Sequence, residues 1–312
     1  MKKILICDLF QNGKGNDAVD CDIILYVPLI KIENNLLFHF YKEPILFDDN
    51  DIIIFSVNED GMHYVKSIKY TIERLISECI QIRNFILGLC PNITIYNDPI
   101  HIESIGDKSL TFEKLKHLSN ITNFSTNINK WTLFPCIIFA KRASGGRHRH
   151  YATNHNELVK ASRKIENAKG KNSYVITNYI NSFINEKNYY HNLRVMVINN
   201  NIVDWFMRPG SHWNIHTKTQ LMDKLDDADL YFKEWLTVSR NKEHLQWLVD
   251  EIYKVYGKGA YAIDCIISND ILMLCEVGYK FWDDTVAHKI HGITKDTHNL
   301  QGYSAKVNRL II

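Results

Sequence analysis

Residues 260–278 constrain the fold more than any other part of the chain. They form two apolar runs rich in β-branched side chains, separated by a Ser-Asn-Asp turn, and this pattern predicts a β-hairpin. Asp264 interrupts the first run, and Glu276 lies near the end of the second. A carboxylate inside a buried strand is costly unless a cation compensates it. Two alternatives therefore stay open: the acids hold a divalent metal ion, or they pair with buried arginine or lysine side chains.

Composition excludes several classes of protein but does not name a partner. The chain has 312 residues, 46% of them hydrophobic, which is enough for one large or two to three small domains. Its 37 basic and 35 acidic residues leave a formal charge of +2, so we expect no nucleic-acid or membrane-surface partner. Seven scattered cysteines without a Cys-x-x-Cys pair favour buried thiols in a reducing compartment. No apolar run approaches the roughly 20 residues of a membrane span, and we expect a cytoplasmic protein.

The first hundred residues alternate predicted strands with one long predicted helix. Apolar residues at three- and four-residue spacing predict that helix over 64–89, and Pro91 follows it. Alternation of this kind favours an open α/β sheet. Asp8 and the Gly13–Gly15 loop would then border a ligand crevice at the carboxyl ends of the strands, with an ordinary loop as the alternative. Strands are predicted at 3–8, 22–28, 35–40, 51–57 and 93–96.

A glycine-containing basic loop follows the predicted strand 134–141. Gly145 and Gly146 allow backbone amides to approach a ligand closely, and Ser144 and Arg147 add a hydroxyl and a charge. Such a loop suits a triphosphate, and an exposed basic hairpin turn is the alternative. A helix predicted at 154–168 and a strand at 174–180 would complete a small lid over a nucleotide.

Two arginines lie inside apolar runs further along the chain. Arg194 and Arg208 belong to two predicted strands joined by an Asn-rich turn. Arginines in such positions need anionic partners. The partner is either a bound ligand or a buried acid of the protein, and the sequence favours neither alternative. A helix predicted at 243–256 would pack on the sheet that carries Asp264 and Glu276.

These features, in this order, resemble the ATP-grasp enzymes. The resemblance is to the branch of glutathione synthetases and of ligases that add glutamate to a ribosomal protein or amino acids to peptides, and it covers about 53–293. It rests on Gly106-Asp107-Lys108, the lysine strand with the Ser144–Arg147 loop, a hinge at 175–180, Asn192-Leu193-Arg194, and Asp264 with Glu276-Val277-Gly278.

The resemblance implies a fold of the α/β class, in the α+β form of the ATP-grasp enzymes. It implies an N-terminal open α/β sheet in 1–105, a linker helix and lid in 106–182, and a C-terminal, mainly antiparallel sheet with helices and the metal site in 183–312.

The resemblance also implies ATP with Mg²⁺ or Mn²⁺ as cofactors and a role for each site residue. Lys108 and Lys141 would contact phosphates, and Asp264 and Glu276 would hold the metal ions. Arg194 and Arg208 would stabilise a transferring phosphoryl group. The triphosphate would lie under Ser144, Gly145, Gly146 and Arg147, and adenine would lie at the hinge of Asn178, Tyr179 and Ile180.

The implied reaction is carboxylate–amine ligation. ATP would phosphorylate a small-molecule or peptide carboxylate, and an amine would displace the phosphate to form an amide bond. A phosphotransferase and a nucleotide-binding module without turnover are the alternatives.

The sequence departs from the family pattern at two positions. Gly278 stands where the family usually has Asn, so one metal ligand is missing, with Asp283 or Asp284 as substitutes. Asn178 stands where the hinge usually begins with Glu. Adenine would then be contacted by backbone groups and by the Asn178 side-chain amide. The basic run 147–150 also exceeds what nucleotide binding needs. It would meet an acidic or phosphorylated acceptor, or else simply face solvent.

Overall fold

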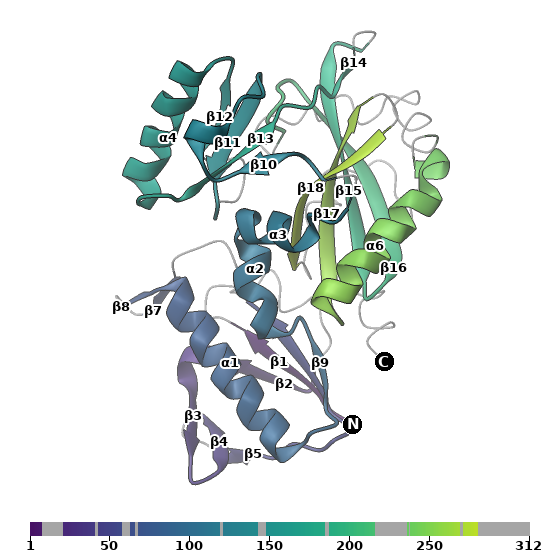
Figure 1. Cartoon of the computed structure of the whole chain (residues 1–312). Helices are drawn as coiled ribbons and strands as arrows, with labels where there is room; N and C mark the ends of the chain where they lie inside the picture. Colours follow the sequence, from purple (N-terminus) through teal and green to yellow (C-terminus); the bar gives the residue numbers. More distant parts are fainter. Residues whose placement is uncertain are drawn as a thin grey trace.

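The computed structural model describes residues 1–7, 21–40, 43–57, 63–65, 68–118, 121–142, 148–184, 187–215, 236, 238–268 and 271–279. Predictions for Asp8, the Gly13–Gly15 loop, the Ser144–Arg147 loop, and Asp283 and Asp284 lie outside these residues. In the described part, most strands belong to three sheets, of four, four and five strands. Figure 1 shows the three sheets as separate groups of strands. We call them the N-terminal sheet, the lid sheet and the central sheet.

The N-terminal sheet is parallel and has the strand order β2-β1-β6-β9. Its strands are β1 (Lys3–Cys7), β2 (Ile23–Tyr26), β6 (Ile52–Ser56) and β9 (Thr94–Tyr96). Ile4, Ile53 and Phe55 on one face pack against helix α1 (Ile72–Leu89). Four short elements follow β2 and precede β6 in the chain: η2 (Val27–Leu29), β3 (Ile30–Glu33), β4 (Leu36–His39) and β5 (Pro44–Ile45).

Helix α1 begins later than the apolar spacing predicts. Thr71 is extended, and its side chain accepts a hydrogen bond from the Arg74 amide, which satisfies one of the free donors at the helix start. The preceding residues form the hairpin β7 (His63–Val65) and β8 (Ile68–Tyr70) instead. The predicted helical start near Tyr64 is therefore wrong, because a cap at Thr71 fixes the boundary.

The lid sheet is antiparallel, in the order β10-β13-β11-β12, and one helix covers it. Its elements are β10 (Phe124–Ser125), η4 (Ile128–Lys130), β11 (Cys136–Ala140), β12 (Arg149–Ala152), α4 (His155–Lys169) and β13 (Tyr174–Asn178). Cys136, Ile138 and Ile176 pack against Leu158 and Ile165 of α4. The intervening residues of β11 and β13 form the opposite face, which we call the inner lid face.

The central sheet is antiparallel throughout and confirms the predicted hairpin. Its strands are β14 (Phe183–Ile184), β15 (Tyr189–Ile198), β16 (Asn201–Gly210), β17 (Ala260–Ser268) and β18 (Ile271–Tyr279). Leu193, Val195 and Ile263 on one face pack against Leu248 and Ile252 of α6 (Lys242–Tyr256). The predicted helix over 243–256 is confirmed.

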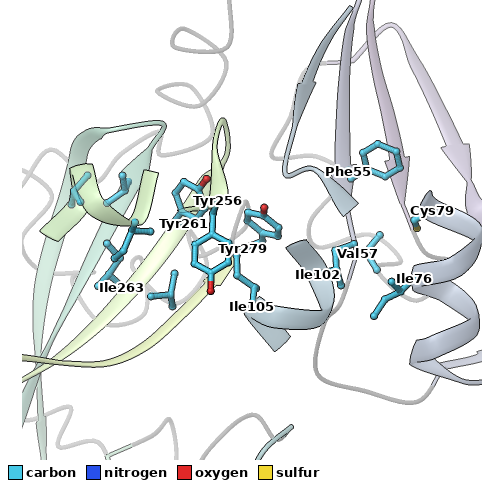
Figure 2. Packing of buried hydrophobic residues seen from close by; sticks show 14 of the residues in the cluster. Phe55, Val57, Ile76, Cys79, Ile102, Ile105, Tyr256, Tyr261, Ile263 and Tyr279 are labelled. Carbon is cyan, nitrogen blue, oxygen red and sulfur yellow. The ribbon is translucent and has the colours of Figure 1, made fainter. Parts of the chain in front are cut away.

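Short helices join the N-terminal and central sheets into one apolar core. Ile102 and Ile105 of α2 (Ile102–Gly106) belong to the same buried cluster as Phe55 and Tyr279, and Figure 2 shows α2 between the strands that carry those two rings. The linking elements are η3 (Pro99–His101), α2 and α3 (Lys108–Leu115). Asn97, which follows β9, adds a polar link, because its Oδ1 accepts a hydrogen bond of 2.9 Å from the Ala260 amide. The predicted mixture of an open α/β sheet with antiparallel sheets and helices is confirmed.

Within the described ranges, no helix has both the length and the apolar character needed to cross a membrane.

Candidate active site

The face of the central sheet opposite α6 is divided into an apolar half and a charged half. Met196 and Ala262 lie in the apolar half, which the N-terminal sheet covers through Leu5, Cys7 and Ile54. Two residues further along these strands, the same face carries Arg194 and Asp264. The charged half therefore begins where the cover of the N-terminal sheet ends.

A β-bulge brings the two predicted metal-binding acids together. Cys265 pairs with Leu274 and Asp264 pairs with Glu276, so Cys275 is an extra residue in β18. A regular ladder would place Glu276 opposite Ile263, on the apolar face against α6. The bulge reverses the alternation, as the buried series Leu272, Leu274, Val277, Tyr279 confirms. Glu276 thus shares the charged face with Asp264.

Asp264 is held by both predicted arginines. Arg194 forms a bidentate pair with it, with Nε 2.7 Å from Oδ1 and NH2 2.9 Å from Oδ2. Arg208 NH2 lies 3.0 Å from Oδ2. Burial alone would raise the pKa of Asp264, but the two guanidinium charges and their hydrogen bonds outweigh it and hold the pKa below its ordinary value. Asn192 Oδ1 accepts a 2.9 Å hydrogen bond from Arg208 Nε and so orients that guanidinium.

Glu276 is held by cations from two other elements. Lys108 Nζ, at the start of α3, lies 3.3 Å from Oε1, and the lysine is 4% exposed. Arg149 NH2, from β12 of the lid sheet, lies 3.9 Å from Oε2. Asp107 caps α3 by accepting hydrogen bonds from the Ser109 and Leu110 amides. This cap fixes the start of the helix, and therefore the point from which the Lys108 side chain projects. Both acids therefore pair with cations, so the pairing alternative holds for each of them in this state.

A backbone hydrogen bond connects Lys141 with Lys108. The Lys108 amide donates to the Lys141 carbonyl at 3.0 Å. Lys141 follows Ile137 and Phe139 at alternate positions, so strand alternation continues the inner lid face to this residue. The fold thus joins the two predicted phosphate lysines at the boundary between α3 and the lid sheet.

The predicted adenine hinge lies at the end of β13. Asn178 is paired with Cys136, so strand alternation directs its side chain to the face that packs against α4. Its Oδ1 is buried and has no hydrogen-bond partner among the described residues. Tyr179 belongs to the inner side, where its ring contacts that of Tyr151 at 5.0 Å between centroids. The Asn178 side chain is therefore directed away from the inner lid face, and the Tyr179 amide already donates to the Pro135 carbonyl at 3.1 Å.

Three side chains of the cluster were not among the predicted site residues. Arg149 contacts Glu276 and also donates from NH1 to Asn214 Oδ1 at 3.3 Å, and Asn192 orients Arg208. Asn192 belongs to the Asn192-Leu193-Arg194 motif on which the resemblance rests, and Arg149 also carried a usable signal. It stands in the basic run after the glycine loop, where a strand pairing with 136–139 would place it opposite Phe139.

The donor set fits one Mg²⁺ ion. Asp264 and Glu276 are cross-strand partners on one face, and Mg²⁺ typically binds one or two carboxylates together with phosphate oxygens and water. Gly278 offers no side-chain ligand. No group of three or more His, Cys, Asp or Glu side chains that could hold a metal occurs in the described ranges.

Comparison with known proteins identifies the fold. No protein-family model and no curated protein sequence matches the chain. The D-alanine–D-alanine ligase from Coxiella burnetii is similar, with a TM-score of 0.55 and 11% identity over 99% of this chain and 93% of that one. An ADP complex of purK, an N5-carboxyaminoimidazole ribonucleotide synthetase, has a TM-score of 0.53 and 10% identity over 97% of this chain and 75% of that one.

A third similar structure is the RimK domain protein ATP-grasp from Sphaerobacter thermophilus. Its TM-score is 0.51, with 7% identity over 98% of this chain and 99% of that one. The chain has the ATP-grasp fold.

Proposed function

We propose that the protein is an ATP- and Mg²⁺-dependent carboxylate–amine ligase. The observation that carries this proposal is the charged half of the central sheet, where four cationic side chains surround two acids. The cluster has an excess of two positive charges. A Mg²⁺-bound nucleoside triphosphate remains a net anion, so its arrival offsets this excess.

The acids and cations of the cluster would exchange partners when the nucleotide binds. Asp264 and Glu276 would hold Mg²⁺, which supplies charge compensation on the phosphate oxygens. Lys108 would then leave Glu276 for a phosphate oxygen and act together with Lys141. Because this exchange takes place on nucleotide binding, the cations would be in position before the chemical step begins.

Arg194 and Arg208 would serve the carboxylate substrate. A guanidinium binds a carboxylate or a phosphate through a planar fork of N–H donors, and Arg194 already uses that geometry on Asp264. Released from Asp264, the two arginines would stabilise the charge of an acyl-phosphate while an amine attacks its carbonyl carbon. The new C–N bond forms as the C–O bond to phosphate breaks, and the amine proton passes to solvent.

The similar structures support the general reaction. One is a ligase that joins two D-alanine residues, and another is a synthetase solved with ADP. The acid and amine of the present protein are small-molecule or peptide substrates whose identity a screen would supply. We also propose the boundaries 1–105, 106–182 and 183–312 for its N-terminal, lid and C-terminal parts.

The fate of the phosphate tests the proposal. ADP and free phosphate should appear together only when a carboxylate substrate is present, and hydroxylamine should trap the activated acyl group as a hydroxamate. The screen would supply amino acids and peptides with ATP and Mg²⁺ and measure ADP release. A stable product heavier by one phosphoryl group, formed without free phosphate or amine, would instead identify a phosphotransferase. Nucleotide binding without any turnover across the screen would favour the binding module.

A further inference from the structure

Arg149 connects the lid sheet with β18 of the central sheet and with the segment that follows β16. It lies on β12 opposite Phe139, and its guanidinium carbon is 5.4 Å from the centre of that ring. NH2 lies 3.9 Å from Glu276 Oε2 in β18, and NH1 donates to Asn214 Oδ1, after β16, at 3.3 Å. The side chain is 28% exposed, so the basic run does not simply face solvent at this position.

The contact of Arg149 with Glu276 is longer than the contact of Lys108 with the same carboxylate. Lys108 lies closer, at 3.3 Å, whereas 3.9 Å is near the limit of an ion pair. Among the described residues, Nε of Arg149 has no acceptor. A guanidinium has five N–H donors, so Arg149 retains capacity for an anion. Phe139 supports the guanidinium from one side and would keep it in the same plane if Glu276 were removed as a partner.

We propose that Arg149 is a phosphate-binding residue that exchanges Glu276 for an oxygen of the distal phosphates when a nucleotide enters. This assignment rests on the proposed function, because Glu276 would turn to Mg²⁺ and release its cations. The planar fork of arginine suits a phosphate better than the single ammonium of lysine does. Since Arg149 belongs to the lid sheet, the contact also links the position of β12 to the presence of the triphosphate.

A purely structural role for Arg149 makes a different prediction. If the side chain only fastens β12 to β18 and to Asn214, its loss should weaken the binding of every adenine nucleotide by the same factor. A phosphate contact instead loses affinity in proportion to the phosphates present. Comparing adenosine, AMP, ADP and ATP therefore separates the two roles.

The test is a calorimetric titration of the full chain with these four ligands, with Mg²⁺ present. Arg149→Met removes the charge and keeps an unbranched side chain over Phe139, and Arg149→Lys keeps the charge without the fork. Arg163→Met, on the exposed surface of α4, is the matched control. We expect Arg149→Met to weaken ATP binding roughly tenfold or more, to change AMP and adenosine binding little, and Arg149→Lys to lie between.

The outcomes separate the two proposals. If the wild-type protein binds ATP and Arg149→Met leaves ATP affinity unchanged, or lowers it equally for all four ligands, the assignment of Arg149 is overturned. If the wild-type protein fails to bind ATP, the proposed function itself is overturned. Thermal melts identify folded variants, and Arg149→Lys provides the comparison if Arg149→Met does not fold.

Discussion

Asp264 and Glu276 face each other across two strands, although regular alternation along β18 would turn Glu276 toward α6. Cys275 is the extra residue that makes this possible. The buried residues of β18 change from even to odd positions at this point, from Leu274 to Val277. The bulge therefore keeps the apolar residues of β18 on the face toward α6 and places Glu276 on the opposite face.

Lys141 should be needed for nucleotide affinity. Lys141→Ala removes a charge-assisted phosphate contact of about 1.5–3 kcal/mol, so ATP affinity should fall by tenfold or more. Titration of ATP in the presence of Mg²⁺ measures this effect. Lys160→Ala, on the exposed surface of α4, is the control and should leave affinity unchanged. Unchanged affinity in a folded Lys141→Ala variant would sink the assignment.

Asp264→Asn should lower both turnover and stability. The variant leaves two guanidinium groups without their carboxylate, and breaking a buried pair in this way costs about 3–5 kcal/mol. Glu276→Gln should cost less stability, because the Glu276 side chain is 33% exposed, and should also nearly abolish turnover. Denaturant melts and ADP release measure the two effects separately. Full activity in either variant would reject its proposed metal role.

Acidification should reveal the unusual pKa of Asp264. Burial opposes its ionised form, but Arg194 and Arg208 prevail and lower the pKa in the folded state. The unfolded chain then binds the proton more readily, so the stabilisation is complete above the unfolded pKa and is lost as the pH falls through it toward the folded value. Denaturant melts from about pH 6 to pH 3 should therefore show a steeper loss in the wild-type protein than in Asp264→Asn. Parallel curves would contradict the shifted pKa.

Metal binding should involve one ion per nucleotide. Only Asp264 and Glu276 supply carboxylates to the described site, and Gly278 supplies none. Gly278 pairs with Ala262 and does not have a positive φ, so an Asn there would lie on the same face as Asp264 without backbone strain. Gly278→Asn should raise the number of Mn²⁺ ions bound with ATP from one to two, as electron paramagnetic resonance would count. Gly278→Ala is the control, and two ions in the wild-type protein would contradict the prediction.

Much of the fold could be predicted from the sequence because its elements carry local signals. The hairpin of β17 and β18 shows β-branched runs around a turn, and α6 has apolar residues at helical spacing. The start of α1 was predicted too early, because apolar spacing continues through residues that pair as a hairpin, and the Thr71 cap decides the boundary.

The candidate site was harder to predict, because its contacts are non-local. Arg194 and Asp264 are 70 residues apart, and only the strand register brings them together. The bulge at Cys275 has no local sequence signal, since Cys fits either face of a strand. Arg149 contacts Glu276 only through the docking of the lid sheet, which hydrophobic patterning does not encode.

The continuity of the apolar core has a consequence for cooperativity. One cluster runs from the N-terminal sheet through α2 to the central sheet, as Figure 2 shows, and includes α6. The α4-facing side of β11 and β13 has a cluster of its own, and their inner face packs in a small cluster with Phe112 of α3. Elements that share a core unfold together, whereas an element with its own core can open locally at a lower free-energy cost than global unfolding. The lid sheet therefore shares less of its packing with the central sheet than the N-terminal sheet does. Hydrogen exchange should be faster in the lid sheet and α4 than in the core shared by the N-terminal and central sheets, so that the proposed nucleotide site can open without loosening the strands that hold the acids.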